Sequence, residues 1–231
     1  MSPAPAAAAG RRLVVAIDGP SGVGKSTAAR RLARRLGVPY LDTGATYRAL
    51  ALAVLASGAD PADRAAVARL AERADLRLEP AADGGLEVLL DGAPVGARIR
   101  ASEVGEASSV IAAYPEVRRR LVALQRAGGE AYGGVIEGRD IGTRVFPGTP
   151  HKYFLTARPD IRHRRRFEQQ RAAGHDVSHR DVAAEIESRD RRDAGRAESP
   201  LTCDPSYTVI DTSELSADEV VERIAHAVES S

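Results

Sequence analysis

A glycine-rich segment near the start of the chain, G-P-S-G-V-G-K-S-T at residues 19–27, constrains the fold more than any other feature. It fits the phosphate-binding loop (P-loop) pattern G-x-x-x-x-G-K-[ST], whose glycines let the backbone turn tightly and aim successive N–H groups at one point. An apolar, β-branched run at 13–17 precedes it and a helix-forming run at 28–36 follows it, as the pattern requires. The segment therefore predicts a site for a nucleoside triphosphate at the positive N-terminal end of a helix.

Two side chains of this loop have expected roles in binding the triphosphate. Lys25 can reach the β- and γ-phosphates, and the hydroxyl of Ser26 can coordinate Mg²⁺. Mg²⁺ is therefore the expected cofactor. The residues expected to hold the triphosphate are Gly19, Pro20, Ser21, Gly22, Val23, Gly24, Lys25, Ser26 and Thr27.

The composition of the 231-residue chain excludes several classes of protein. A net charge of +1 with 28% charged residues does not favour a nucleic-acid binder, and no apolar stretch is long enough to span a membrane. The single cysteine, Cys203, leaves no intramolecular disulfide and fits a reducing compartment. Residues 1–10 lack the features of a signal peptide and are expected to form a disordered tail. We therefore expect a soluble, cytoplasmic protein.

Strand-like and helix-like segments alternate along most of the chain. This alternation predicts an α/β fold with a doubly wound parallel sheet and helices on both faces. The expected strands lie at 13–17, 39–42, 134–136, 153–155 and 207–211. The expected helices lie at 28–36, 44–56, 61–74, 102–113, 117–131, 160–173 and 180–193, and a last helix follows the capping box at 216–219.

One stretch departs from this alternation. Residues 75–79 alternate polar and apolar side chains, and the turn signal Gly84-Gly85 follows them. Residues 86–90 are strongly apolar, and the turn signal Asp91-Gly92 follows them. The pattern predicts a small antiparallel β subdomain at 76–100. The core is then expected to comprise residues 11–75 and 101–231.

Three further clusters offer arginine beside small or acidic residues. They are L-D-T-G-A-T-Y-R at 41–48, E-G-R-D at 137–140 and R-D-R-R-D-A-G-R at 189–196. Each lies near the expected end of a strand or helix, and ligands of open α/β sheets bind at the carboxyl ends of the strands. The three clusters are therefore expected to converge into a cage for a second phosphate.

Together with the insertion, these motifs resemble the bacterial cytidylate kinases, a branch of the nucleoside monophosphate kinases. The resemblance runs from about Leu13 to Val228 and rests on five motifs in the family's order: I-D-G-P-S-G-x-G-K, L-D-[ST]-G-x-x-Y-R, S-x-x-A-x-x-P-x-V-R at 109–118, G-R-D-x-G and R-D-x-R-D. Two positions depart from the family pattern. Thr43 stands where serine is common, and Glu137 stands where aspartate is frequent.

The resemblance implies a P-loop kinase core that transfers the γ-phosphoryl group of ATP to CMP or dCMP. The acceptor phosphate would contact Arg48, Arg139 and Arg196, which with Lys25 form the expected catalytic set. The ribose would contact Asp193, near Arg189. The residues matched to CMP binding are Thr43, Tyr47, Arg48, Ser109, Arg118, Arg139, Asp140, Arg189, Asp193 and Arg196.

Among these, Asp140, Arg118 and Ser109 match the family's base-contacting positions. For Asp140, an internal ion pair with Arg139 or another arginine is the alternative. The arginine-rich helix within 158–173 is expected to be a lid over ATP. Because a helix repeats every ~3.6 residues, only part of its arginines can face one ligand, and we assign Arg162 and Arg166 to ATP. A monomer is expected.

Two other functions remain open on the sequence. A small-molecule P-loop kinase acting on a hydroxyl would benefit from a base, which Asp42 or Asp140 could supply. A P-loop switch or motor would require a strand ending in an acidic residue that holds Mg²⁺, to which residues 135–137 are a loose match.

Overall fold

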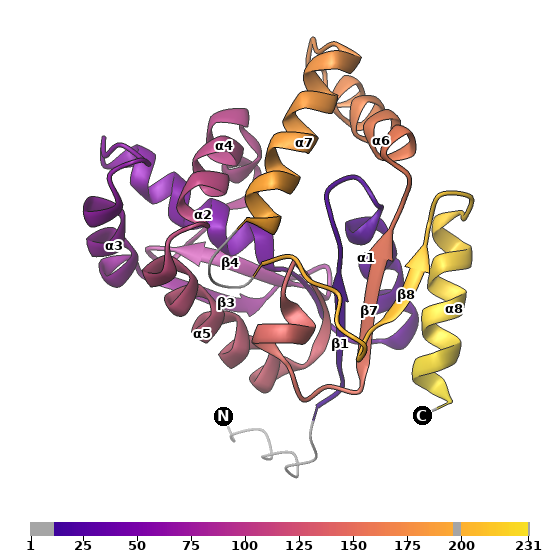
Figure 1. The fold of residues 1–231 in the computed structure, drawn as a ribbon. Helices are drawn as coiled ribbons and strands as arrows, with labels where there is room; N and C mark the ends of the chain where they lie inside the picture. Colours follow the sequence, from indigo (N-terminus) through magenta and orange to yellow (C-terminus); the bar gives the residue numbers. More distant parts are fainter. Residues whose placement is uncertain (1–11, 196–199, 231) are drawn as a thin grey trace, which may run out of the picture.

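The computed structural model describes residues 12–195 and 200–230 of the chain. The expected tail at 1–10 and Arg196 lie outside the described residues. A five-stranded parallel sheet, ordered β2-β6-β1-β7-β8, forms the centre of the molecule (Figure 1). Its strands are β1 (Val14–Asp18), β2 (Tyr40–Asp42), β6 (Gly134–Glu137), β7 (His151–Thr156) and β8 (Thr208–Asp211).

Helices cover both faces of this sheet, and the strand residues show why. On β1, Val15 and Ile17 belong to one hydrophobic core cluster, whereas Ala16 between them belongs to another. Because neighbouring strand residues point to opposite faces, a strand buried on both sides must be apolar throughout. The predicted doubly wound parallel sheet is confirmed. The helices of this layer are α1 (Lys25–Leu36) and α8 (Ala217–Glu229) on one face, and α2 (Thr43–Ala56), α3 (Arg64–Arg73), α4 (Ser102–Ile111) and α5 (Pro115–Tyr132) on the other.

A separate antiparallel sheet interrupts this layer, as expected. Its strands are β3 (Leu76–Pro80), β4 (Leu86–Leu90) and β5 (Ala93–Pro94), followed by the 3₁₀ turn η1 (Gly96–Arg100). The sheet does not build a core of its own, because Leu78 and Val88 belong to the same cluster as residues of α2 and α5. The contact is close: a Cβ on Gly128 of α5 would lie 2.7 Å from Leu78 Cδ1.

Helix α3 begins later than expected. The predicted start at Pro61 is wrong, since the helix begins at Arg64 and residues 61–62 form a turn. The carboxylate of Asp63 caps the helix by accepting from the backbone N–H of Ala66 at 3.0 Å. An N-cap acceptor outweighs the preference of proline for a first helical position because it satisfies a backbone donor directly.

Helices α6 (Pro159–Ala172) and α7 (His179–Ala194) form a hairpin that projects beyond the carboxyl ends of the central strands (Figure 1). A helix is therefore present where the lid was expected, and its role as a lid remains a prediction. Its first turn packs directly on the P-loop, because a Cβ on Gly22 would lie 2.8 Å from the carbonyl oxygen of Arg162. Gly22 also has a φ of 81°, so glycine is required at this contact for two independent reasons.

Within residues 12–195 and 200–230, none of the helices combines the length and apolar character needed to cross a membrane.

Candidate active site

The P-loop connects the end of β1 to the start of α1. Gly24, with a φ of 90°, stands at the N-terminal cap of that helix, so backbone N–H groups of the loop and first turn face the same space. Lys25 is buried, and its ammonium donates to the carbonyl oxygen of Pro20 at 2.6 Å. Burial lowers the pKa of Lys25, and the positive charges of Arg139 and Arg189 lower it further. Two arginines of the predicted second phosphate site therefore lie close to the P-loop lysine.

An acidic group lies beside the loop at the end of β6, the strand next to β1. Glu137 is buried, accepts a hydrogen bond from the Tyr40 hydroxyl, and lies within hydrogen-bond reach of the Ser26 side chain. Burial raises the pKa of Glu137, as does the neighbouring carboxylate of Asp42. Hydroxyl and carboxylate oxygens are the ligand types that Mg²⁺ accepts, so this donor set fits the expected cofactor.

The cluster at 41–48 closes around the same strand end. The hydroxyl of Thr43 donates to the carbonyl oxygen of Glu137 at 2.7 Å, which ties the start of α2 to β6. Thr43 thus keeps the hydroxyl function that serine provides in the family pattern. Arg48, one turn along α2, pairs with Asp42 at 3.4 Å and stays partly exposed.

The cluster at 137–140 is held by two ion pairs that reach distant helices. Arg139 donates through Nε to Asp193 of α7 at 2.8 Å, and the carboxylate of Asp193 is almost completely buried. Asp140 pairs with Arg118 of α5 at 2.5 Å, with 3% of the arginine side chain and 7% of the aspartate side chain exposed. The ion pair considered for Asp140 therefore exists, and its partner is Arg118 rather than Arg139.

The arginines at this end of the sheet crowd one another. Burial lowers the pKa of Arg189 to about 9, and the charges of Arg139, Arg48 and Arg166 contribute to the decrease while Asp193 opposes it. Three guanidinium groups near Arg189 therefore stand against one opposing carboxylate. The arrangement favours an anion as the ligand of this cluster.

At the predicted base-contacting positions, two buried polar atoms have no hydrogen-bond partner among the described residues: Ser109 Oγ and Arg118 Nε. Arg118 also lies over the ring of Tyr47, with its guanidinium carbon 5.5 Å from the ring centre. Buried polar atoms are seldom left unpaired, because desolvation without a hydrogen bond is costly. These atoms are consistent with a polar ligand group beside Arg118.

The two lid arginines assigned to ATP have different surroundings. Arg162 donates to the carbonyl oxygen of Ser21 at 3.2 Å and pairs with Asp190 of α7 at 2.6 Å. Arg166 pairs instead with Glu185 of α7 at 3.3 Å. The structure therefore brings Arg162 to the P-loop, whereas Arg166 is held by the second helix of the lid.

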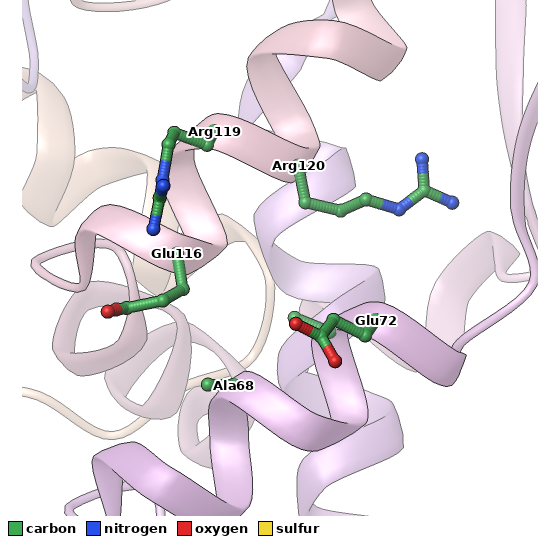
Figure 2. Close-up of a pocket in the computed structure, with 6 residues that line it drawn as sticks. Ala68, Glu72, Glu116, Arg119 and Arg120 are labelled. Atoms are coloured by element: carbon green, nitrogen blue, oxygen red, sulfur yellow. The ribbon is translucent and has the colours of Figure 1, made fainter.

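The arginine run at 118–120 divides between two places. Arg118 points into the site, whereas Arg119 and Arg120 line a surface hollow between α3 and α5 (Figure 2). Glu72 and Glu116 line the same hollow, so it carries both signs of charge. It contains none of the predicted site residues, and the balanced charges give no preference for a phosphate.

Sequence reasoning missed two residues that bridge the site. Asp18 directly precedes Gly19, and its carboxylate accepts from the Tyr207 hydroxyl at 2.7 Å. A charged residue at the end of an apolar strand was a visible signal for Asp18. No local signal marks Tyr207, because the contact spans 189 positions of the chain.

Comparisons with known proteins agree with this geometry. The model of a family described as Cytidylate kinase matches residues 15–230. A relative named cytidylate kinase from Corynebacterium glutamicum is 50% identical over 221 residues, which cover 95% of each chain. Relatives of the same name from Symbiobacterium thermophilum and Mycobacterium leprae are 47% and 45% identical, and the matches cover 93% and 94% of this chain and 95% of each relative.

Among solved structures, an uncharacterized protein from Eubacterium ventriosum is similar in fold. The TM-score is 0.54 at 15% sequence identity, and the match covers 96% of this chain and 100% of that one.

Proposed function

The chain belongs to the cytidylate kinase family, and on that premise we propose that it transfers the γ-phosphoryl group of ATP to the 5′-phosphate of CMP or dCMP. The products are ADP and CDP or dCDP. The observation that carries the proposal is the placement of Arg139 and Arg189 beside Lys25, the lysine of a P-loop. Two phosphate-binding sets in contact are what a phosphoryl transfer between two phosphates requires.

The donor side of the site comprises residues 19–27. Its backbone N–H groups bind the phosphates of ATP, and Lys25 moves from the carbonyl oxygen of Pro20 to the migrating group. Ser26 and Glu137 would hold Mg²⁺, which when bound neutralises phosphate charge and orients the β- and γ-oxygens.

The acceptor side comprises residues 42–48, 109–118, 137–140 and 189–193. Arg48 and Arg139 bind the phosphate of CMP, because planar guanidinium groups match phosphate oxygens in pairs. Arg196 is assigned to the same phosphate by its motif. An acceptor phosphate is already an oxyanion near neutral pH, so its oxygen attacks without a general base. The chain's contribution is then alignment and neutralisation of charge.

The buried Arg118–Asp140 pair supports recognition of cytosine. A carboxylate accepts from the N4 amino group of cytosine, and an arginine donates to its acceptor atoms. Ser109 Oγ and Arg118 Nε, both buried and unpartnered among the described residues, are available for the same base. Asp193 is assigned to the ribose, and the hydrogen bond from Arg139 fixes the orientation of the Asp193 carboxylate.

The other two functions have weaker support. A hydroxyl acceptor would require a base, yet the two candidates are held by arginines: Asp42 by Arg48 and Asp140 by Arg118. Each ion pair engages a carboxylate oxygen that a base would have to turn toward the substrate hydroxyl. A switch would hydrolyse ATP irrespective of CMP.

An acceptor panel tests the proposal. The purified protein with ATP and Mg²⁺ is assayed for ADP release with CMP, dCMP, UMP, AMP, a hydroxyl acceptor such as shikimate, or no acceptor. We expect release that depends on CMP or dCMP, together with a stoichiometric amount of CDP or dCDP. Equal release without any acceptor would support a switch, and release only with the hydroxyl compound would overturn the phosphate acceptor.

We also propose that the enzyme is a cytoplasmic monomer. The single cysteine supports a reducing compartment. Light scattering on a size-exclusion column should give about 24.4 kDa, the mass of one chain, and cell fractionation should recover the activity in the cytosol.

A further inference from the structure

Asp18 is the last residue of β1 and directly precedes the P-loop, yet its side chain turns toward the acceptor side. The carboxylate is fully buried. Oδ1 accepts from the backbone N–H of Ile141 at 3.0 Å, and Oδ2 accepts from the N–H of Gly142 at 2.9 Å. The Tyr207 hydroxyl donates to Oδ2 as well, at 2.7 Å.

These three donors come from the two segments that follow acceptor-side residues in the chain. Ile141 and Gly142 begin the π-helical turn η2 (Ile141–Val145), immediately after Arg139 and Asp140. Tyr207 lies at the entrance to β8, in the segment that returns from α7. Asp18 therefore connects the donor loop, the turn behind Arg139 and the return from the lid through one carboxylate.

The fit around this carboxylate is tight. A Cβ on Gly142 would lie 2.7 Å from the hydroxyl oxygen of Tyr207. No side chain larger than that of glycine can stand there without displacing the hydroxyl, and displacement would break its bond to Asp18. The geometry leaves one arrangement of the turn relative to β1.

Holding a charge at this position is costly for the fold. Burial raises the pKa of Asp18 to about 6, although the three hydrogen bonds act in the opposite direction. The ionisable groups that face it are Tyr207, Asp140, Lys25 and Cys203. Of these only Lys25 is positive, and its ammonium donates to the carbonyl oxygen of Pro20 rather than to Asp18. A group that burdens stability in this way is expected to serve alignment instead.

We propose that Asp18 is a positioning residue that fixes the turn behind Arg139 and Asp140 against the P-loop strand, and so sets the spacing between the two phosphate sites. The inference rests on the proposed function. The ionised form is the aligning form, because only the carboxylate accepts from all three donors. The protonated acid resembles an amide, which must turn an N–H or O–H group toward one of the donors.

Asp18→Asn tests this with almost no change in volume. At pH 7.5 we expect kcat/KM for CMP to fall by ~10- to 10²-fold, the scale of a misaligned reacting group. The KM for ATP should change less than about threefold, because the backbone of the P-loop keeps its own glycine-determined path. Asp75→Asn, which replaces an exposed carboxylate paired with Arg77, is the matched control and should leave both constants unchanged.

The pH dependence separates alignment from a general structural effect. The ratio of wild-type to Asp18→Asn kcat/KM is measured from pH 5 to 8, and titration of the CMP phosphate cancels because both enzymes share it. The ratio should be large above about pH 6 and approach one below it, as Asp18 becomes protonated. Tyr207→Phe removes a donor that favours the carboxylate, so it should move the acid limb of the profile to higher pH.

Three results would overturn the inference: activity of a folded Asp18→Asn protein within twofold of wild type, a ratio that does not vary with pH, or an unshifted profile in Tyr207→Phe. The last variant keeps the test valid if Asp18→Asn does not fold. Failure of the proposed function is a distinct result, since wild type itself would then form no CDP from CMP.

Discussion

The proposed donor side of the active site occupies one unbroken stretch, residues 19–27, whereas the proposed acceptor side gathers its charged groups from four segments spread between residues 42 and 196. Backbone N–H groups and glycine conformations build the donor side. Ion pairs between the loop after β6 and distant helices build the acceptor side, namely Asp140 with Arg118 of α5 and Arg139 with Asp193 of α7. On the proposed function, local backbone geometry binds ATP, whereas side-chain pairs between distant segments form the site that selects CMP.

Loss of the lysine side chain on the donor side should give the largest effect. Lys25→Ala removes the charge aimed at the migrating phosphoryl group, and we expect kcat to fall by at least ~10²-fold. Steady-state kinetics with CMP measure it. Arg34→Ala, which removes an exposed charge from the same helix, is the control and should retain full activity. Near-normal turnover in a folded Lys25→Ala protein would contradict the assignment of Lys25 to the migrating phosphoryl group.

Next in size is the effect of breaking the pair that reads the base. Asp140→Ala should lower kcat/KM for CMP by ~10- to 10³-fold, about 1.4–4 kcal/mol, while UMP turnover suffers much less. The difference arises because uracil would already place its O4 oxygen against the Asp140 carboxylate. Equal losses for both nucleotides would show that Asp140 only supports the site.

This variant also leaves Arg118 buried without its partner, which destabilises the fold by several kcal/mol. Asp140→Asn, which keeps a hydrogen-bond acceptor for Arg118, should be more stable than Asp140→Ala. It should show the same larger loss of turnover with CMP than with UMP. Assays below the melting temperature of each variant separate the loss of folded protein from the loss of recognition.

Replacing Asp18, which links the two sides, should give a smaller effect. The Asp18→Asn change is expected to lower activity but to raise stability near neutral pH. Because the folded-state pKa of Asp18, about 6, exceeds its ordinary value of 3.8, the protonated group favours folding below about pH 4 and that contribution is lost as the pH rises through 6. Relative to wild type, Asp18→Asn should therefore gain stability on the order of 3 kcal/mol between pH 4 and pH 7. Urea unfolding of both proteins at each pH measures the change, and a constant difference would contradict it.

The smallest effect concerns motion. Closure over both nucleotides excludes water, so amide exchange in residues 76–100 and in α6 should slow by about tenfold when a bisubstrate analogue is bound. Exchange in the buried strand β1 should not change, which provides an internal control. Unchanged exchange in both segments at demonstrated saturation would reject a closing motion.

The same contrast explains what the sequence could predict. The P-loop and the capping box at Ser216 and Glu219 depend on contacts between neighbours in the chain, and both are present. The parallel sheet pairs distant strands, but the alternation of strand and helix patterns that predicts it is local, and the sheet is present too. The predicted start of α3 at Pro61 was wrong because the N-cap at Asp63 outweighed the preference of proline for a first helical position. Local rules compete at such boundaries, and their balance depends on geometry that a sequence does not contain.

On the acceptor side, the motifs identified the charged residues but not their partners. Nothing near Asp140 indicates that Arg118 rather than the adjacent Arg139 will pair with it, because that choice depends on how α5 packs against β6. The same holds for Tyr207 and Asp18, which meet only after β1, η2 and the return from α7 are in place. Pairings of this kind follow from the assembled core.

The close contact between Gly22 and Arg162 has a mechanical consequence. Because its first turn packs against the P-loop, we expect α6 to pivot about that contact rather than slide as a body. Its 14 residues extend for about 20 Å, so a rotation that barely shifts Arg162 sweeps the far end, around residues 173–178, through the widest arc. We therefore expect binding of the triphosphate at the P-loop to displace the far end of α6 more than its first turn.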